Sequence, residues 1–259
     1  MANYYFLTSM LPPLEVGHTP GLHFEELNAI LQERLSVEDY EQFRVMRRFV
    51  DLENLRFFLK SEPLDPRGNL SKEDIEEALS LKFGFPEYVF EFMERYESLS
   101  DRLHHFTSLL VQFFSEETPL FEGFLLDYLT FEREWNLVMV AFRAKNLGRD
   151  ISRELQYEDP SDQIVAQILA QKDAMGFEPP FGYEDLKVIF ENKRSDPMAF
   201  HKALCEYRFN RIRELEAGEL FSLDRILGYV ARLMIVERWL EMDQKLGNSI
   251  VENMINEAG

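Results

Sequence analysis

The chain has 259 residues and a formal net charge of −19 at pH 7. This acidity argues against nucleic acid and against direct docking on anionic lipid, because both carry negative phosphates. No run of about 18 uncharged apolar residues occurs, so we expect no insertion into a bilayer. The single cysteine, Cys205, allows no internal disulfide and fits a reducing cytosol.

Helix start and stop signals begin with a long predicted helix over 36–62. Ser36 is its expected N-cap, and acidic residues follow in the first turn, where they suit the helix dipole. A second helix is predicted from Ser71, with Asp74 in the capping-box position and Gly84 as its stop. Pro86 is expected at the first position of a third helix, and a fourth follows over 100–117.

The most apolar predicted helix begins near Leu120, after Pro119, and ends at Gly148. One stripe along it is aromatic and aliphatic, at positions 124, 128, 131, 135, 138 and 142. A second face carries Glu132, Asn136 and Arg143 at helical spacing. We expect these polar groups to be buried, either joining this helix to a neighbouring loop or helix end, or lining a socket for a partner.

The second half of the chain shows the same signals. Helices are predicted over 160–176, over 183–194, from Asp196 to Gly218 and from Ser222 to Gly247. Alternating strand patterns and Asn-Gly or Asp-Gly hairpin signals are nearly absent. The connecting segments, at 12–21, 63–69 and 176–182, are short. The sequence therefore predicts a single all-α body over 1–259.

A weak internal repeat runs through three of these helices. "VDLENLRFFLKSE" carries Asp51 and Asn54, and "FEREWNLVMVAFRAKNLG" carries Glu134 and Asn136 followed by Arg143. "ILGYVARLMIVERWLEM" is a looser copy with Tyr229 and Glu237, in which Trp239 replaces the Asn. The unequal spacings predict three diverged helical units, approximately 1–84, 85–176 and 177–259.

These motifs resemble the C subunit family of V-type ATP synthases, which corresponds to subunit d of eukaryotic vacuolar pumps. The closest match is "EREWNLVMVAFRAKNLG", and the late helix with Tyr229 and Glu237 is similar to the C-terminal helix of that family. The opening "NYYFLTSMLPPLE" is similar to a bacterial group that resembles this subunit. The resemblance identifies the chain as a divergent bacterial member.

The resemblance implies a funnel of three helical units in a pseudo-threefold arrangement. It implies a non-catalytic coupling subunit without cofactors, placed between the central stalk and the membrane rotor ring, that transmits torque for proton or sodium ion transport. The expected location is cytoplasmic, peripheral on the inner membrane through the ATPase complex. Asp51, Asn54, Glu132, Glu134, Asn136, Arg143, Tyr229 and Glu237 are the candidate interaction residues.

A cytosolic helical adaptor and a metal-dependent helical-bundle enzyme are the alternatives. Asp101 and His104 have the i, i+3 spacing of di-iron bundle proteins, but no second matching motif is evident. His201 and Cys205, four residues apart, could pair on one helix face, although a buried thiol is the simpler interpretation. No phosphate-binding glycine motif is present. The sequence thus favours no metal site and no catalytic residue.

Overall fold

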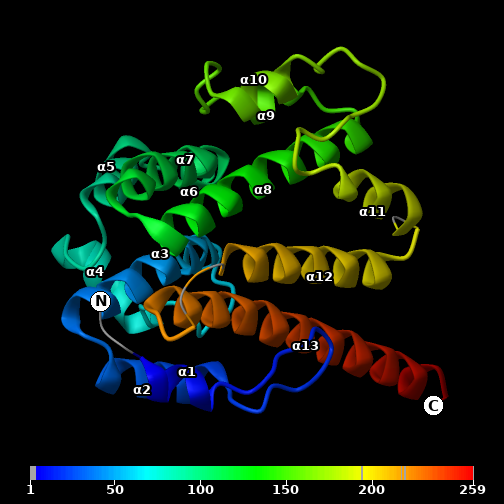
Figure 1. The fold of residues 1–259 in the computed structure, drawn as a ribbon. Coiled ribbons are helices and arrows are strands. Elements are labelled where there is room, and N and C mark those ends of the chain that lie inside the picture. The colour runs from blue at the N-terminus through cyan, green and yellow to red at the C-terminus, as the bar shows by residue number, and fades with distance from the viewer. Residues whose placement is uncertain (1–3, 194, 217, 219, 259) are drawn as a thin grey trace. The chain divides into compact units, whose positions relative to one another are not determined.

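The computed structural model is all-α, as predicted (Figure 1). It describes residues 4–193, 195–216, 218 and 220–258. No β-strand occurs in these described ranges. Within them, no helix combines the length and the apolar character that crossing a membrane requires.

The contacts divide the chain into two compact units. Met1–Tyr40 joins Val188–Gly259 in the first unit, and Glu41–Lys187 forms the second. Two helices, α3 (Val37–Leu59) and α11 (Asp185–Lys193), continue from one unit into the other. The three sequence units have other boundaries, and their pseudo-threefold arrangement stays a prediction.

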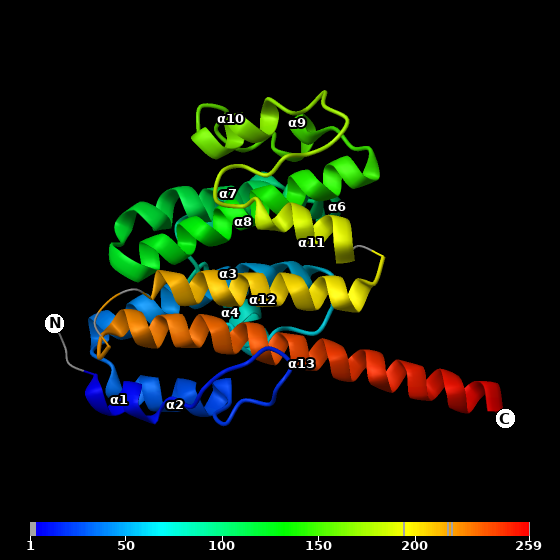
Figure 2. The same ribbon diagram turned by 45° about the vertical axis from the view of Figure 1, so that its right-hand side comes forward.

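In the first unit, two long antiparallel helices, α12 (Pro197–Leu215) and α13 (Leu223–Ala258), pack along each other (Figure 2). The short helix α1 (Tyr5–Met10) and α2 (Phe24–Arg34) both contact α13. Close packing leaves no room for a side chain at Gly228, where an added Cβ would lie 2.2 Å from Cγ of Glu216. Arg232 holds that carboxylate, with its Nε 2.5 Å from Oε1 of Glu216.

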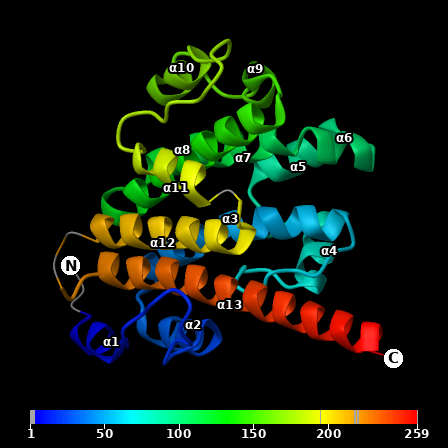
Figure 3. The same ribbon diagram turned by 90° about the vertical axis from the view of Figure 1, so that its right-hand side faces the viewer.

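In the second unit, α8 (Gly123–Leu147) is the long central helix, and α7 (Phe106–Glu117) and η1 (Thr118–Leu120) lead into it (Figure 3). A buried carboxylate, Glu117, joins three helices: it accepts hydrogen bonds from Arg48 of α3 at 2.5 Å and from Tyr88 of α5 at 2.6 Å. The other helices of this unit are α4 (Lys72–Leu81), α5 (Glu87–Arg95), α6 (Leu99–His104), α9 (Ile151–Glu154) and α10 (Gln163–Leu169).

Four predicted helix starts, at Ser36, Ser71, Asp196 and Ser222, are confirmed by side-chain caps. The Ser36 hydroxyl accepts a hydrogen bond from the backbone N–H of Asp39 at 3.1 Å. Ser71 forms the predicted capping box with Asp74. The carboxylate of Asp196 accepts from two backbone N–H groups of the first turn of α12. These caps satisfy donors that a helix start leaves without partners, and so fix where each helix begins.

Several predicted bounds are wrong. The helix predicted over 160–176 spans only Gln163–Leu169, and the helix expected to begin near Leu120 begins at Gly123. Pro86 is the residue before α5, not its first residue. α13 continues past Gly247 to Ala258. The single helix predicted over 100–117 is broken at His105 into α6 and α7. Lys82, in a left-handed conformation with φ 52°, ends α4 before Gly84. Helices α1, α2 and α9 are additional elements that the patterns did not predict.

Candidate functional site

Asp51 lies on α3 with 3 % of its surface exposed. Its carboxylate accepts hydrogen bonds from the backbone N–H of Asn69 at 2.5 Å and of Leu70 at 3.1 Å, and from the Asn69 amide at 2.6 Å. Burial raises the pKa of Asp51, although these hydrogen bonds and Arg47 oppose the shift. α3 thereby holds the chain immediately before α4 begins.

Asn54 lies one turn further along α3 and is completely buried. Its amide donates to the carbonyl oxygen of Asp65 at 2.9 Å and accepts from the Asp65 N–H at 2.8 Å. The loop fits so closely that a Cβ on Gly68 would lie 2.7 Å from both the Asn54 amide and the Asp51 carboxylate. Asn54 therefore acts as a two-bond clamp on the 63–69 segment.

Glu134 makes a comparable contact from α8. Its Oε2 accepts a hydrogen bond from the hydroxyl of Tyr183 at 2.8 Å. Tyr183 is buried and stacks on Phe131, with ring centroids 6.4 Å apart. The contact lies just before Asp185, where α11 begins.

Glu237 makes the third contact, from α13. Its Oε1 accepts from the backbone N–H of Phe24 at 2.9 Å and lies 3.0 Å from Nδ1 of His23. Only 15 % of the Glu237 side chain is exposed. Because Phe24 is the first residue of α2, Glu237 caps the positive end of that helix from outside.

The three contacts share one arrangement. The carboxylate anchors, by which we mean Asp51, Glu134 and Glu237, lie on the three longest described helices, α3, α8 and α13. Each accepts a hydrogen bond from residues at or just before the start of another helix, α4, α11 and α2 respectively. The sequence repeat predicted the three carboxylate anchors, but it did not predict the residues that donate hydrogen bonds to them.

The predicted polar face of α8 differs from expectation. Glu132 is buried at 3 % exposure, but Asn136 is half-buried and Arg143 is exposed. Burial decreases toward the C-terminal end of α8, where Leu147 is also exposed. The long Arg143 side chain therefore reaches water. The apolar stripe of α8 is buried as predicted, at Phe124, Tyr128, Phe131, Trp135, Val138 and Phe142.

Tyr229 lies in the core of the first unit at 4 % exposure. Burial raises the pKa of Tyr229 to about 12, with the guanidinium of Arg232 opposing the shift. The central carbon of that guanidinium lies 5.9 Å from the centre of the Tyr229 ring. The same guanidinium donates hydrogen bonds to the carboxylate of Glu216. The residue therefore packs against an internal ion pair.

His201 and Cys205 do meet on one face of α12, with Nε2 and Sγ 3.6 Å apart. Burial raises the pKa of the Cys205 thiol, and burial together with Arg208 and Arg238 lowers the pKa of His201. Both shifts favour neutral groups, whereas a nucleophilic pair requires a thiolate. In the described part of the chain, no three His, Cys, Asp or Glu side chains come together as a metal site.

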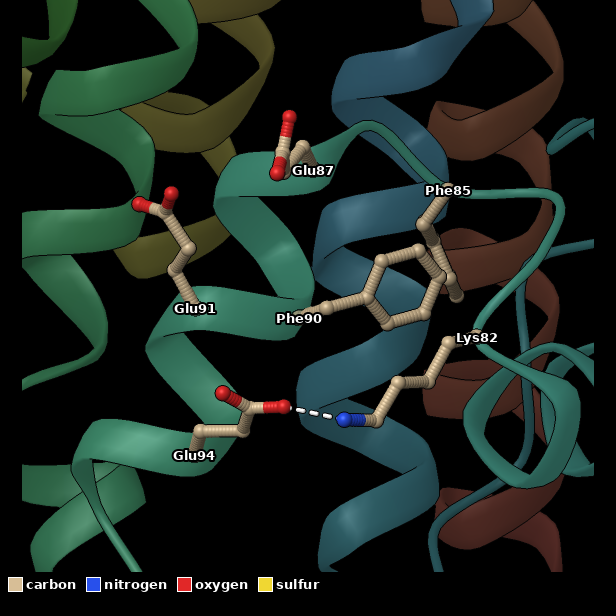
Figure 4. A pocket seen from close by; sticks show the side chains of 6 residues that line it. All are labelled: Lys82, Phe85, Glu87, Phe90, Glu91 and Glu94. Carbon is tan, nitrogen blue, oxygen red and sulfur yellow. Dashed lines mark hydrogen bonds and ion pairs between the residues drawn. The ribbon is translucent and has the colours of Figure 1, made fainter.

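A concave acidic surface lies where α4 leads into α5 (Figure 4). We call it the acidic groove, a cavity of about 440 Å³ lined by Lys82, Phe85, Glu87, Phe90, Glu91 and Glu94. Lys82 and Glu94 form an ion pair across it. The rings of Phe85 and Phe90 meet edge to face, with centroids 6.5 Å apart. No sequence motif singled out these residues.

A second cavity of about 490 Å³ lies beside α9. It carries charges of both signs, since Arg149 pairs with Glu154 at 3.5 Å and Asp150 caps α9. Tyr157, which lines the cavity, is hydrogen-bonded through its hydroxyl to His105, whose ring stacks on Tyr96. Because positive and negative side chains both line this cavity, it favours neither an anionic nor a cationic ligand.

The comparisons with known proteins agree with one another. A family model described as "Protein of unknown function (DUF2764)" matches residues 1–258. A Chlamydia pneumoniae protein is 30 % identical over 260 residues, and a Chlamydia muridarum protein is 28 % identical over 260 residues. Each alignment covers 98 % of both chains, and both relatives are called uncharacterized proteins. No solved structure matches the chain. The chain belongs to the DUF2764 family.

Proposed function

We propose that this chain is a non-catalytic central-rotor coupling subunit of a V-type ATP synthase or ATPase. It would link the central stalk to the membrane rotor ring and transmit torque for proton or sodium ion transport. Its partners are then the stalk subunits and the ring. It would lie in the cytoplasm, peripheral on the inner membrane through the complex.

The recurrence of the carboxylate anchors carries the proposal. The motifs that resemble the V-type C subunit family contain Glu134 and Glu237 two residues before Asn136 and Trp239, and Asp51 three residues before Asn54. All three carboxylates support a following or preceding helix from a long helix. A shared role at three positions is the expected result of divergence from one repeated unit. It supports the three-unit architecture that the resemblance implies.

Long helices with buried polar ties suit a part that transmits force. An α-helix deforms little along its axis because every turn is hydrogen-bonded, and ties such as Asn54 to Asp65 oppose sliding of a loop along its helix. The neutral His201 and Cys205 pair supports a role without covalent catalysis.

The test is co-purification from native membranes. A tagged chain, recovered after mild detergent extraction, should bring the rotor ring and the stalk subunits in fixed stoichiometry. Deletion of the chain should uncouple ATP hydrolysis from ion transport. Recovery of the chain as a free protein, together with a fully coupled pump in the deletion strain, would overturn the proposal.

A second measurement separates the proposal from a metal-dependent enzyme. Elemental analysis of the purified chain should find less than stoichiometric iron and manganese. One metal ion per chain, retained through gel filtration, would favour the helical-bundle enzyme instead. An adaptor would bring down partners unrelated to the rotary complex.

A further inference from the structure

We propose that the acidic groove, together with the exposed side chains of Leu81 and Phe83, binds a basic amphipathic helix of a partner protein. The inference concerns a surface that the proposed rotary role does not use, and it does not depend on that role. It follows from the shape, the charge and the apolar content of the segment between α4 and α5.

The charge of the groove is arranged along one helix face. Glu87, Glu91 and Glu94 are exposed and spaced i, i+4, i+7 on α5, so their carboxylates form a row about 10 Å long. Of the six side chains drawn in Figure 4, only Lys82 and Glu94 pair. Glu87 and Glu91 face solvent with their charges available to a partner.

The apolar part of the surface consists of two rings that line the cavity and two exposed side chains at the end of α4 and in the turn that follows it. Phe83 is 80 % exposed and Leu81 is 65 % exposed, whereas Phe85 and Phe90 form the wall of the cavity. The turn that presents Leu81 and Phe83 is fixed by Lys82 at φ 52° and Gly84 at φ 101°. Large apolar side chains held outward by a tight turn are typical of a surface that a partner covers.

A basic helix complements both parts of this surface. Lysine or arginine at i and i+4 would match the spacing of Glu87 and Glu91, the two carboxylates of the row that do not pair with Lys82. The aliphatic stem of such a residue can pack against Phe90 while its charge remains near Glu87 or Glu91. The surrounding sequence adds a wider attraction, because residues 71–97 hold eight acidic and three basic residues.

The probe is a fluorescent 16-residue peptide of Leu, Ala and Lys with its lysines and leucines at helical spacing. A second peptide of identical composition, with its order scrambled to remove the amphipathic face, serves as the comparison. Binding to the full-length chain is followed by fluorescence anisotropy in about 0.1 M salt. The helical peptide should bind at least about tenfold more tightly than the scrambled one, because only the helical peptide places its lysines and its leucines on ordered faces that can contact the carboxylates and the apolar side chains together.

Matched charge variants locate the site. Replacing Glu87→Gln together with Glu91→Gln should weaken binding about fivefold. Replacing Glu73→Gln together with Glu77→Gln, an exposed pair of equal spacing on α4, should leave it nearly unchanged. Phe83→Ser should weaken binding without changing the thermal midpoint, because the side chain is exposed.

Four outcomes would overturn the inference. In the first, neither peptide binds, and in the second, both peptides bind equally. In the third, the double substitution on α4 weakens binding as much as the double substitution on α5, which would indicate general attraction to an acidic protein. In the fourth, sedimentation shows the chain self-associating and Phe83→Ser abolishing it, so that a second copy covers this surface.

Discussion

At the scale of single residues, Asn54 is a buried polar group that ties the 63–69 segment to α3. Its amide oxygen and nitrogen are both used, on the N–H and the carbonyl of the same residue, Asp65. Asn54 is completely buried and Asp65 is half-buried, so water replaces the lost amide only in part if the side chain is removed. The amide contributes most through the cost of leaving Asp65 unsatisfied.

Asn54→Ala should therefore lower the free energy of unfolding by about 2–3 kcal/mol, measured by urea denaturation. Asn136→Ala is the matched control, because it removes the same side chain from the corresponding place in α8. Asn136 is only half-buried, and its loss should change stability by less than about 0.5 kcal/mol. Equal losses in the two variants would show that both amides are internal ties, as the sequence repeat alone suggests.

The sequence predicted the candidate residues better than it predicted their surroundings. Asp51, Asn54 and Glu237 stand out because polar groups recur in otherwise apolar helices. Their partners, Asn69, Asp65 and Phe24, are distant in sequence or lie in loops, where helical periodicity gives no information. The prediction that Arg143 is buried was wrong for a related reason. Helical periodicity gives the face on which a side chain lies, but not whether a neighbouring element covers that face.

At the scale of elements, local chemistry decided which bounds were predictable. Ser36, Ser71 and Asp196 cap their helices through residues two or three positions away, so the signal lies within the sequence window. Gly247 was expected to end α13, but a glycine inside a helix costs only about 1 kcal/mol, and the helix continues. The start of α2 has a local signal, because the Glu26 carboxylate accepts a hydrogen bond from the backbone N–H of His23 at 3.1 Å. Its second cap, Glu237, lies 213 residues away, where no local pattern can reveal it.

The packing of α12 on α13 should depend on pH through His201. Its ring stacks on Trp239 of α13 at 5.5 Å, and burial, together with Arg208 and Arg238, lowers its pKa below the ordinary 6.5. The folded state thus binds a proton less readily than the unfolded state. Acidification from about pH 8 should reduce the free energy of unfolding as pH falls through the unfolded pKa, until the folded pKa is passed.

Urea denaturation between about pH 5 and about pH 8 measures this dependence. His201→Gln should flatten the part of the profile near pH 6.5. His18→Gln, which changes an exposed histidine, should leave the profile as it is in the unmodified chain. A profile that both substitutions leave unchanged would show that His201 titrates alike in the folded and unfolded states.

At the scale of the whole molecule, the charge of −19 is an excess that the described ion pairs do not balance. Many of those pairs are exposed, as between Arg44 and Glu41 or between Lys72 and Glu76, and such pairs contribute little. The repulsion among the remaining carboxylates acts over a longer range and is relieved when the chain expands. Net electrostatics should therefore oppose folding at low ionic strength.

Added salt should accordingly stabilise this protein. Raising NaCl from about 10 mM to about 150 mM shortens the screening length from about 30 Å to about 8 Å, which weakens the long-range repulsion most. The thermal midpoint, followed by circular dichroism, should rise by about 3 °C. The Glu73→Gln and Glu77→Gln double variant has two fewer negative charges, so its midpoint should start higher and rise less. A midpoint that falls with salt would mean that close pairs, such as Arg48 with Glu117 at 2.5 Å, outweigh the repulsion of the whole surface.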